Sequence, residues 1–123
     1  MPHAAILFLM VALGGAVGSV LRHGVNVWIG APVATLAVNI AGCFIMGLLA
    51  GYGAFVAQLP EHWRVFLMVG VLGGLTTFSA FSLDFLTLME RGQLALAAGY
   101  VLGSVFLSLL AVFAGLGLVK ALA

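Results

Sequence analysis

The chain has 123 residues, of which 65% are hydrophobic and 6% are charged, and its formal net charge is +1. So few charged side chains cannot cover the surface of a water-soluble globule, and the composition therefore indicates a membrane protein. A single cysteine, Cys43, excludes a disulfide within the chain.

Four apolar stretches are long enough to cross a bilayer core of about 30 Å. We predict one all-α transmembrane domain over residues 1–123, with helices near 4–21, 33–57, 65–89 and 94–119. The first stretch lacks the basic start of a secretory signal, and we expect a retained helix that packs through Gly14, Gly15 and Gly18.

The basic residues near the helix ends give little preference for one orientation. Arg64 and Lys120 fall on the side of the termini, and Arg22 and Arg91 fall on the opposite side. This tie predicts insertion in both directions, although ties are also common when charges are so few. A bundle of four helices is too thin to shelter a hydrated path at its own centre, so we expect the chain to form an oligomer. A two-fold partner of opposite orientation would be related by an axis in the membrane plane.

Residues 73–82, GGLTTFSAFS, interrupt the third helix near its middle. Paired Gly73 and Gly74 allow backbone angles that break a helix, and carbonyls freed at membrane depth need partners. A small cation is one such partner, as in the discontinuous helices of transporters. The alternative is a packing glycine pair with a mild kink.

Beyond the glycines, aromatic rings and hydroxyls share one short segment. Phe78, Phe81 and Phe85 recur on one helical face. Aromatic edges carry partial positive charge, so edge-on rings beside hydroxyls predict a path for an anion. The hydroxyls belong to Thr76, Thr77, Ser79 and Ser82.

Polar residues also interrupt the second and fourth helices. The amide of Asn39 can donate to an anion or join two helices. Tyr100, Ser104 and Ser108 form a ladder of hydroxyls at helical spacing. The alternative is that these serines are small packing residues beside the pair Gly99 and Gly103.

Two charged residues lie near helix ends. Asp84 is a functional candidate or an acid solvated at the interface, and Arg22 can snorkel, cap its helix or attract anions. No pairing of nucleophile and base can be assembled, so we do not expect an enzyme.

Three segments resemble the bacterial fluoride channel family, Fluc or CrcB: GGAVGSVLR at 14–22, TLAVNIAGCFIMG at 35–47 and GVLGGLTTFSAFS at 70–82. The resemblance covers nearly the whole chain. It implies an antiparallel, dual-topology homodimer in the cytoplasmic (inner) membrane, with two fluoride pores and a structural Na⁺ at the dimer interface. It also implies lipid contact and no nucleic-acid partner.

The resemblance assigns roles to individual residues. Backbone carbonyls of Gly73 and Thr76 would bind Na⁺, and Arg22 would serve the vestibule or the fold. The fluoride pore would be lined by Asn39, Phe78, Phe81, Thr77, Ser79, Tyr100, Ser104 and Ser108. Two positions depart from the family pattern, because Ala80 stands where Thr is common and Asp84 where Glu is frequent.

We therefore predict a passive fluoride-selective channel that exports fluoride from the cytoplasm and relieves its toxicity. The main alternative is a dual-topology, proton-coupled exporter of the small multidrug resistance type, which would need a coupling acid in its first helix. A third possibility is a noncatalytic subunit of a membrane assembly, with no flux of its own.

Overall fold

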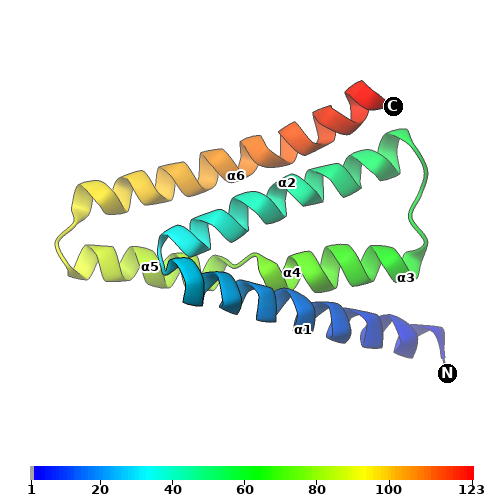
Figure 1. Cartoon of the computed structure of the whole chain (residues 1–123), viewed down its shortest axis with the longest axis horizontal. Coiled ribbons are helices and arrows are strands. Elements are labelled where there is room, and N and C mark those ends of the chain that lie inside the picture. The colour runs from blue at the N-terminus through cyan, green and yellow to red at the C-terminus, as the bar shows by residue number, and fades with distance from the viewer. Residues whose placement is uncertain (1) are drawn as a thin grey trace.

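A computed structural model describes residues 2–123 and shows a helical bundle with no strand in that range (Figure 1). Within the described residues, four spans are long and apolar enough to cross a membrane, and the third, Glu61–Glu90, consists of four consecutive segments. The predicted all-α fold with a broken third helix is confirmed. The elements are α1 (His3–Ile29), α2 (Val33–Phe55), α3 (Glu61–Arg64), the π-helical η1 (Val65–Val71), α4 (Leu72–Leu75), α5 (Phe78–Glu90) and α6 (Leu94–Leu122).

α1 continues to Ile29, well beyond the expected end near residue 21. Gly30 ends the helix with a positive φ of 87°, a conformation that favours glycine, and its N–H bonds to the carbonyl of Asn26. Arg22 therefore lies inside a helix rather than at its end. It is still close enough to the membrane boundary to count in the charge balance that sets orientation.

The break in the third span lies at two threonines and not at the paired glycines. Gly73 and Gly74 are helical residues of α4, whereas Thr76 (ψ 154°) and Thr77 (φ −153°) are extended. Gly74 serves close packing, because a Cβ there would lie 2.7 Å from the carbonyl oxygen of Gly15 in α1. Gly74 thus allows α1 to approach the third span closely, and the chain unwinds just after this residue.

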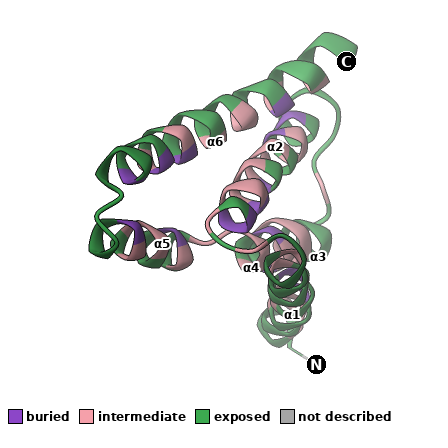
Figure 2. Ribbon diagram, turned by 60° about the vertical axis from the view of Figure 1, so that its left-hand side comes forward, coloured by how far each residue is buried: buried purple, intermediate pink, exposed green. Residues whose placement is uncertain are grey.

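Glycines also set the other close helix contacts. A Cβ at Gly14 or Gly18 would meet backbone atoms of η1, and one at Gly47 or Gly115 would meet backbone atoms across the α2–α6 contact. Two packed groups result: α1 lies against η1 and α4 of the third span, and α2 lies against α6. The buried residues of both groups face inward (Figure 2). By contrast, Cβ atoms at Gly99 and Gly103 would meet no described atom within 4 Å, so this glycine pair makes no close helix contact within the chain.

Both termini lie at the same end of the bundle as the connection between α2 and α3 (Figure 1). At that end His3 Nε2 lies 3.0 Å from Glu61 Oε2 and joins the start of α1 to the start of the third span. Large apolar side chains such as Phe8, Trp28 and Phe106 are exposed around the bundle. This outer surface suits contact with lipid tails.

Candidate ion site at the break of the third span

The side chain of Asn39 in α2 holds the break in place. Its Oδ1 accepts a hydrogen bond from the backbone N–H of Thr77 at 2.7 Å, and its Nδ2 donates to the carbonyl of Thr77 at 3.0 Å. Because Thr77 is extended, neither backbone group has a helical partner, and Asn39 supplies both. Only one of its two Nδ2 hydrogens is used, so the amide keeps a second donor.

Hydroxyl groups near the break mostly satisfy the local backbone. Thr77 Oγ1 accepts from the N–H of Ala80 at 3.1 Å and caps α5, which explains why that helix begins at Phe78. Thr76 and Ser82 donate to the carbonyls four residues before them, at 2.9 and 3.0 Å. These two hydroxyls are therefore engaged within their own segments.

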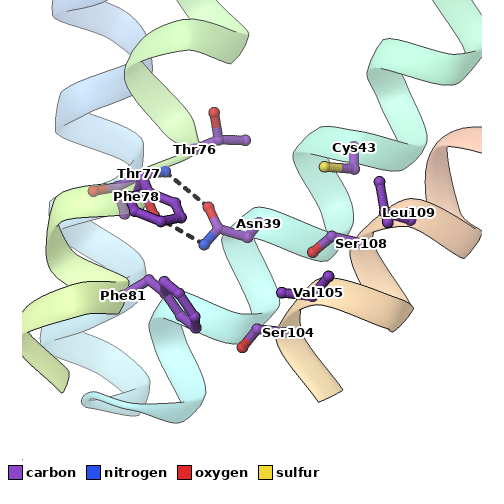
Figure 3. Close-up of a pocket in the computed structure, with 10 residues that line it drawn as sticks. All are labelled: Asn39, Cys43, Thr76, Thr77, Phe78, Phe81, Ser104, Val105, Ser108 and Leu109. Carbon is purple, nitrogen blue, oxygen red and sulfur yellow. Dashed lines mark hydrogen bonds between the residues drawn. The ribbon is translucent and has the colours of Figure 1, made fainter. Parts of the chain in front are cut away.

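A cavity of about 310 Å³ lies beside the break, between α2, α5 and α6 (Figure 3). Ser104 differs from the threonines, because its Oγ is buried and has no hydrogen-bond partner among the described residues. Its residue is only 5% exposed, so this unpaired hydroxyl is held next to the cavity. The cavity is lined by Asn39, Cys43, Thr76, Thr77, Phe78, Phe81, Ser104, Val105, Ser108 and Leu109.

Three aromatic rings follow one another from the cavity into the protein. The centroids of Phe78 and Phe81 lie 5.4 Å apart at an interplanar angle of 53°, and those of Phe81 and Tyr100 lie 5.3 Å apart. Phe81 is buried, whereas Phe78 is 78% exposed within a single chain. Phe85, the third member of the predicted stripe, packs against the core cluster and does not line the cavity.

Tyr100 and Asp84 form a pair behind this cavity. The Tyr100 hydroxyl donates to Asp84 Oδ2 at 2.8 Å, so the acid has a partner within the protein. Tyr100 does not line the cavity, and neither does Ser79, whose Oγ lies 3.3 Å from Thr77 Oγ1. Both residues are thus adjacent to the cavity lining and not part of it.

A second cavity, of about 430 Å³ and more polar, lies on the other side of Thr77. Arg22, His23 and Asp84 line it, and Thr77 is common to both cavities. Arg22 Nε donates to the carbonyl of Gly74 at 3.0 Å, so its positive charge points towards the break. The arrangement places a cation, Arg22, and a carboxylate, Asp84, on the wall of the same polar cavity.

The unwound segment also offers oxygen ligands for a cation. Arg22 occupies the carbonyl of Gly74, but no hydrogen bond to the carbonyls of Gly73 or Thr76 is present in residues 2–123. Side chains give no alternative, since no group of three His, Cys, Asp or Glu residues in that range is placed to hold a metal. Backbone oxygens of this kind suit a small hard cation such as Na⁺.

The residues predicted for the pore come mostly to one place. Asn39, Thr77, Phe78, Phe81, Ser104 and Ser108 line the cavity together. Cys43 also lines the cavity and was not predicted to do so, although its position one helical turn after Asn39 puts both residues on the same face of α2. Val105 and Leu109 were missed because nothing distinguishes them from lipid-facing residues.

A four-span bundle with a broken span, and beside the break a largely apolar cavity that carries a few polar groups, is typical of an integral membrane protein that passes a small solute. The sequence comparisons specify which one. The family model described as CrcB-like protein, Camphor Resistance (CrcB), matches residues 9–116. The chain belongs to this family and is a multi-pass protein of the inner membrane.

Similar proteins of the family share most of the chain. It is 59% identical over 114 residues to the fluoride-specific ion channel FluC of Paracoccus denitrificans, covering 89% of this chain and 90% of that protein. It is 50% identical over 121 residues to FluC of Rhodopseudomonas palustris, covering 94% and 98%. It is also 51% identical over 120 residues to FluC of Rhodospirillum centenum, covering 93% and 95%.

Proposed function

We infer that this chain is a passive fluoride-specific ion channel. Relatives that share about half or more of its residues are named fluoride-specific ion channels. Those names describe channels and agree with the prediction that the chain is not an enzyme. The structural observation that carries the inference is the pair of spare donors among the residues of one cavity. Asn39 keeps one Nδ2 hydrogen after its bond to Thr77, and the buried hydroxyl of Ser104 has no partner among the described residues.

Fluoride is small and strongly hydrated, so a narrow path must replace its water with closely spaced donors. In this cavity the donors are the second Nδ2 hydrogen of Asn39, the hydroxyls of Ser104 and Ser108, and the positive edges of Phe78 and Phe81. Chloride is larger and cannot approach all of these groups closely. The path therefore selects by dense contact with a small anion.

Arg22 at the wall of the second cavity would raise the local concentration of anions before they reach the rings. No energy source is needed for exit down a gradient, so fluoride accumulated in the cytoplasm would leave and its toxicity would be relieved. The alternative of a proton-coupled exporter is not favoured, because the first span contains no Asp or Glu.

Purified protein in liposomes loaded with fluoride is expected to release it rapidly, and to release chloride far more slowly. A fluoride electrode outside the vesicles measures the efflux. Equal release of both anions, or none, would refute the inference. Fluoride release only with a proton gradient would instead support the exporter.

Replacing Phe78 or Phe81 by isoleucine is expected to slow fluoride efflux, because an aromatic edge is lost from the cavity. An aromatic contact contributes about 0.5–1.5 kcal/mol, which corresponds to about a two- to tenfold change in rate. Phe85→Ile is the matched control, since Phe85 lies on the same helical stripe but outside the cavity. A Phe85 variant as slow as the other two would remove the rings from the path.

We further propose that the channel is an antiparallel homodimer. Phe78 is largely exposed in a single chain although it lines the cavity, so a second copy is suited to cover it. The near balance of basic residues between the two ends supports insertion in both directions. A two-fold axis in the membrane plane would then bring the two breaks close to each other.

Two reporter enzymes are fused to the C-terminus, one that is active only in the cytoplasm and one that is active only in the periplasm. Both fusions are expected to show activity. Each fusion is made separately and assayed in cells. Signal from one side alone would show a single orientation and contradict the antiparallel dimer.

The carbonyls of Gly73 and Thr76, which no described group satisfies, are proposed to hold a structural Na⁺ at the dimer interface. Support comes from the open surroundings of Gly73, where an added Cβ would meet only one atom, at 3.9 Å. Space on that side is available for the second copy. A bound cation there would supply positive charge for four carbonyls in all, two from each chain.

Replacing Na⁺ by N-methylglucamine at equal ionic strength is expected to lower the melting temperature of the purified dimer. A ligand at 100 times its dissociation constant stabilises the folded state by about 2.7 kcal/mol. Thermal unfolding in detergent measures the shift without any transport assay. An unchanged melting temperature would argue against the Na⁺ site and leave the fluoride path untouched.

A further inference from the structure

A third cavity, of about 320 Å³, lies at the end of the bundle that carries both termini. It opens between the last turns of α2 and the start of the third span, away from the break. None of its residues lines the two cavities described above. The lining residues are Leu49, Ala50, Gly53, Gln58, Leu59, Arg64 and Met68.

One end of this cavity carries an uncompensated positive charge. The described residues place no carboxylate within ion-pair distance of Arg64, and Glu61, three residues earlier, pairs with His3. Lys120 lies at the same end of the bundle, with its Nζ 5.9 Å from the ring centroid of Phe55. The cavity lining therefore carries one positive charge, that of Arg64, and Gln58 adds an amide that can donate to a ligand of the same cavity.

The rest of the cavity is apolar, with side chains from Leu49, Leu59 and Met68. Gly53 leaves additional room on α2, because a Cβ there would meet nothing within 4 Å. Trp63, next to Arg64, is 53% exposed, and tryptophan is enriched at the boundary between membrane and water. A cationic end at this depth and an apolar interior match the two parts of a phospholipid.

We propose that this cavity binds an anionic phospholipid, with the headgroup phosphate at Arg64 and the start of an acyl chain along Leu49 and Met68. Basic pockets between transmembrane helices bind acidic headgroups, and a free phosphate ion would leave the apolar walls without a partner. The proposal does not depend on fluoride passage. It gives the chain a lipid preference that is independent of the ion path.

Binding is tested on the detergent-purified protein by native mass spectrometry with phosphatidylglycerol and phosphatidylcholine that have identical acyl chains. The wild-type protein is expected to prefer phosphatidylglycerol, and Arg64→Gln is expected to reduce that preference about fivefold, the value of one basic contact near a membrane surface. Arg64→Lys should keep most of it. Gly53→Leu, which fills the cavity, should weaken the binding of both lipids, whereas excess inorganic phosphate should displace neither.

Two matched variants separate this site from general attraction and from misfolding. Arg91→Gln removes one positive charge at the opposite end of the bundle, and Gly24→Leu adds the same bulk at another open glycine. Both should bind phosphatidylglycerol as the wild type does. An unchanged preference in Arg64→Gln, an equal loss in Arg91→Gln, or displacement of the lipid by inorganic phosphate would each overturn the proposal.

Discussion

Replacing Asn39 by leucine is expected to abolish fluoride efflux and to destabilise the protein. The substitution leaves the N–H and the carbonyl of Thr77 without partners at membrane depth. Each orphaned group costs about 1–3 kcal/mol, so the total is about 2–6 kcal/mol. Thermal unfolding in detergent measures the stability, and liposome efflux measures the transport.

Asn39→Asp refines this expectation, because an aspartate oxygen still accepts from the N–H of Thr77 but an ionised carboxylate cannot donate to its carbonyl. It should be more stable than Asn39→Leu and equally inactive, since it puts an acceptor where fluoride needs a donor. Asn26→Leu is the control, because Asn26 lines the second cavity and its side chain makes no hydrogen bond within the described residues. If Asn39→Leu conducts normally, the amide neither holds the break nor contacts the ion.

Replacing Gly115 by alanine is expected to prevent close packing of α6 on α2. The added Cβ would lie 2.8 Å from the backbone nitrogen of Leu48 and 3.0 Å from the carbonyl carbon of Gly47, and backbone atoms cannot move aside as a flexible side chain can. Overpacking of this kind costs about 1–3 kcal/mol. The yield of folded protein on size exclusion and its melting temperature should both fall.

Gly117→Ala provides the comparison within the same helix. An added Cβ at this position meets no described atom within 4 Å, and alanine favours a helix over glycine by about 1 kcal/mol. This variant should be as stable as the wild type or slightly more stable. Equal losses in the two variants would show that the effect of Gly115 does not come from contact with α2.

The four spans could be predicted because apolar length is a local property of the sequence. The end of α1 could not, because the polar residues Arg22 and His23 suggested a helix boundary, whereas the first residue that stops the helix is Gly30. Within the helix, Arg22 donates a hydrogen bond to the carbonyl of Gly74 on the third span and lines a polar cavity. Gly74 lies about fifty residues away in the sequence, and nothing in the residues around Arg22 indicates this contact.

The exact position of the break in the third span also depends on contacts that the local sequence does not show. This position was predicted within a few residues, but the glycines were expected to unwind and are instead helical, and Gly74 packs against α1. What unwinds the chain at Thr77 is a pair of hydrogen bonds to Asn39 in another helix. The amide was recognised as a candidate from its apolar surroundings, whereas its role as the partner of the break depends on tertiary contact.

Thr77 lines both central cavities, and this has a consequence for the electric field across the membrane. Where the two cavities open to opposite faces of the membrane and fill with water, most of the membrane voltage would fall over the protein that separates them. Moving one charge through the full potential involves about 2.3 kcal/mol per 100 mV. An anion that crosses at Thr77 would therefore gain or lose most of this electrostatic energy over the length of a single residue. Only over that distance would the anion have no contact with bulk water.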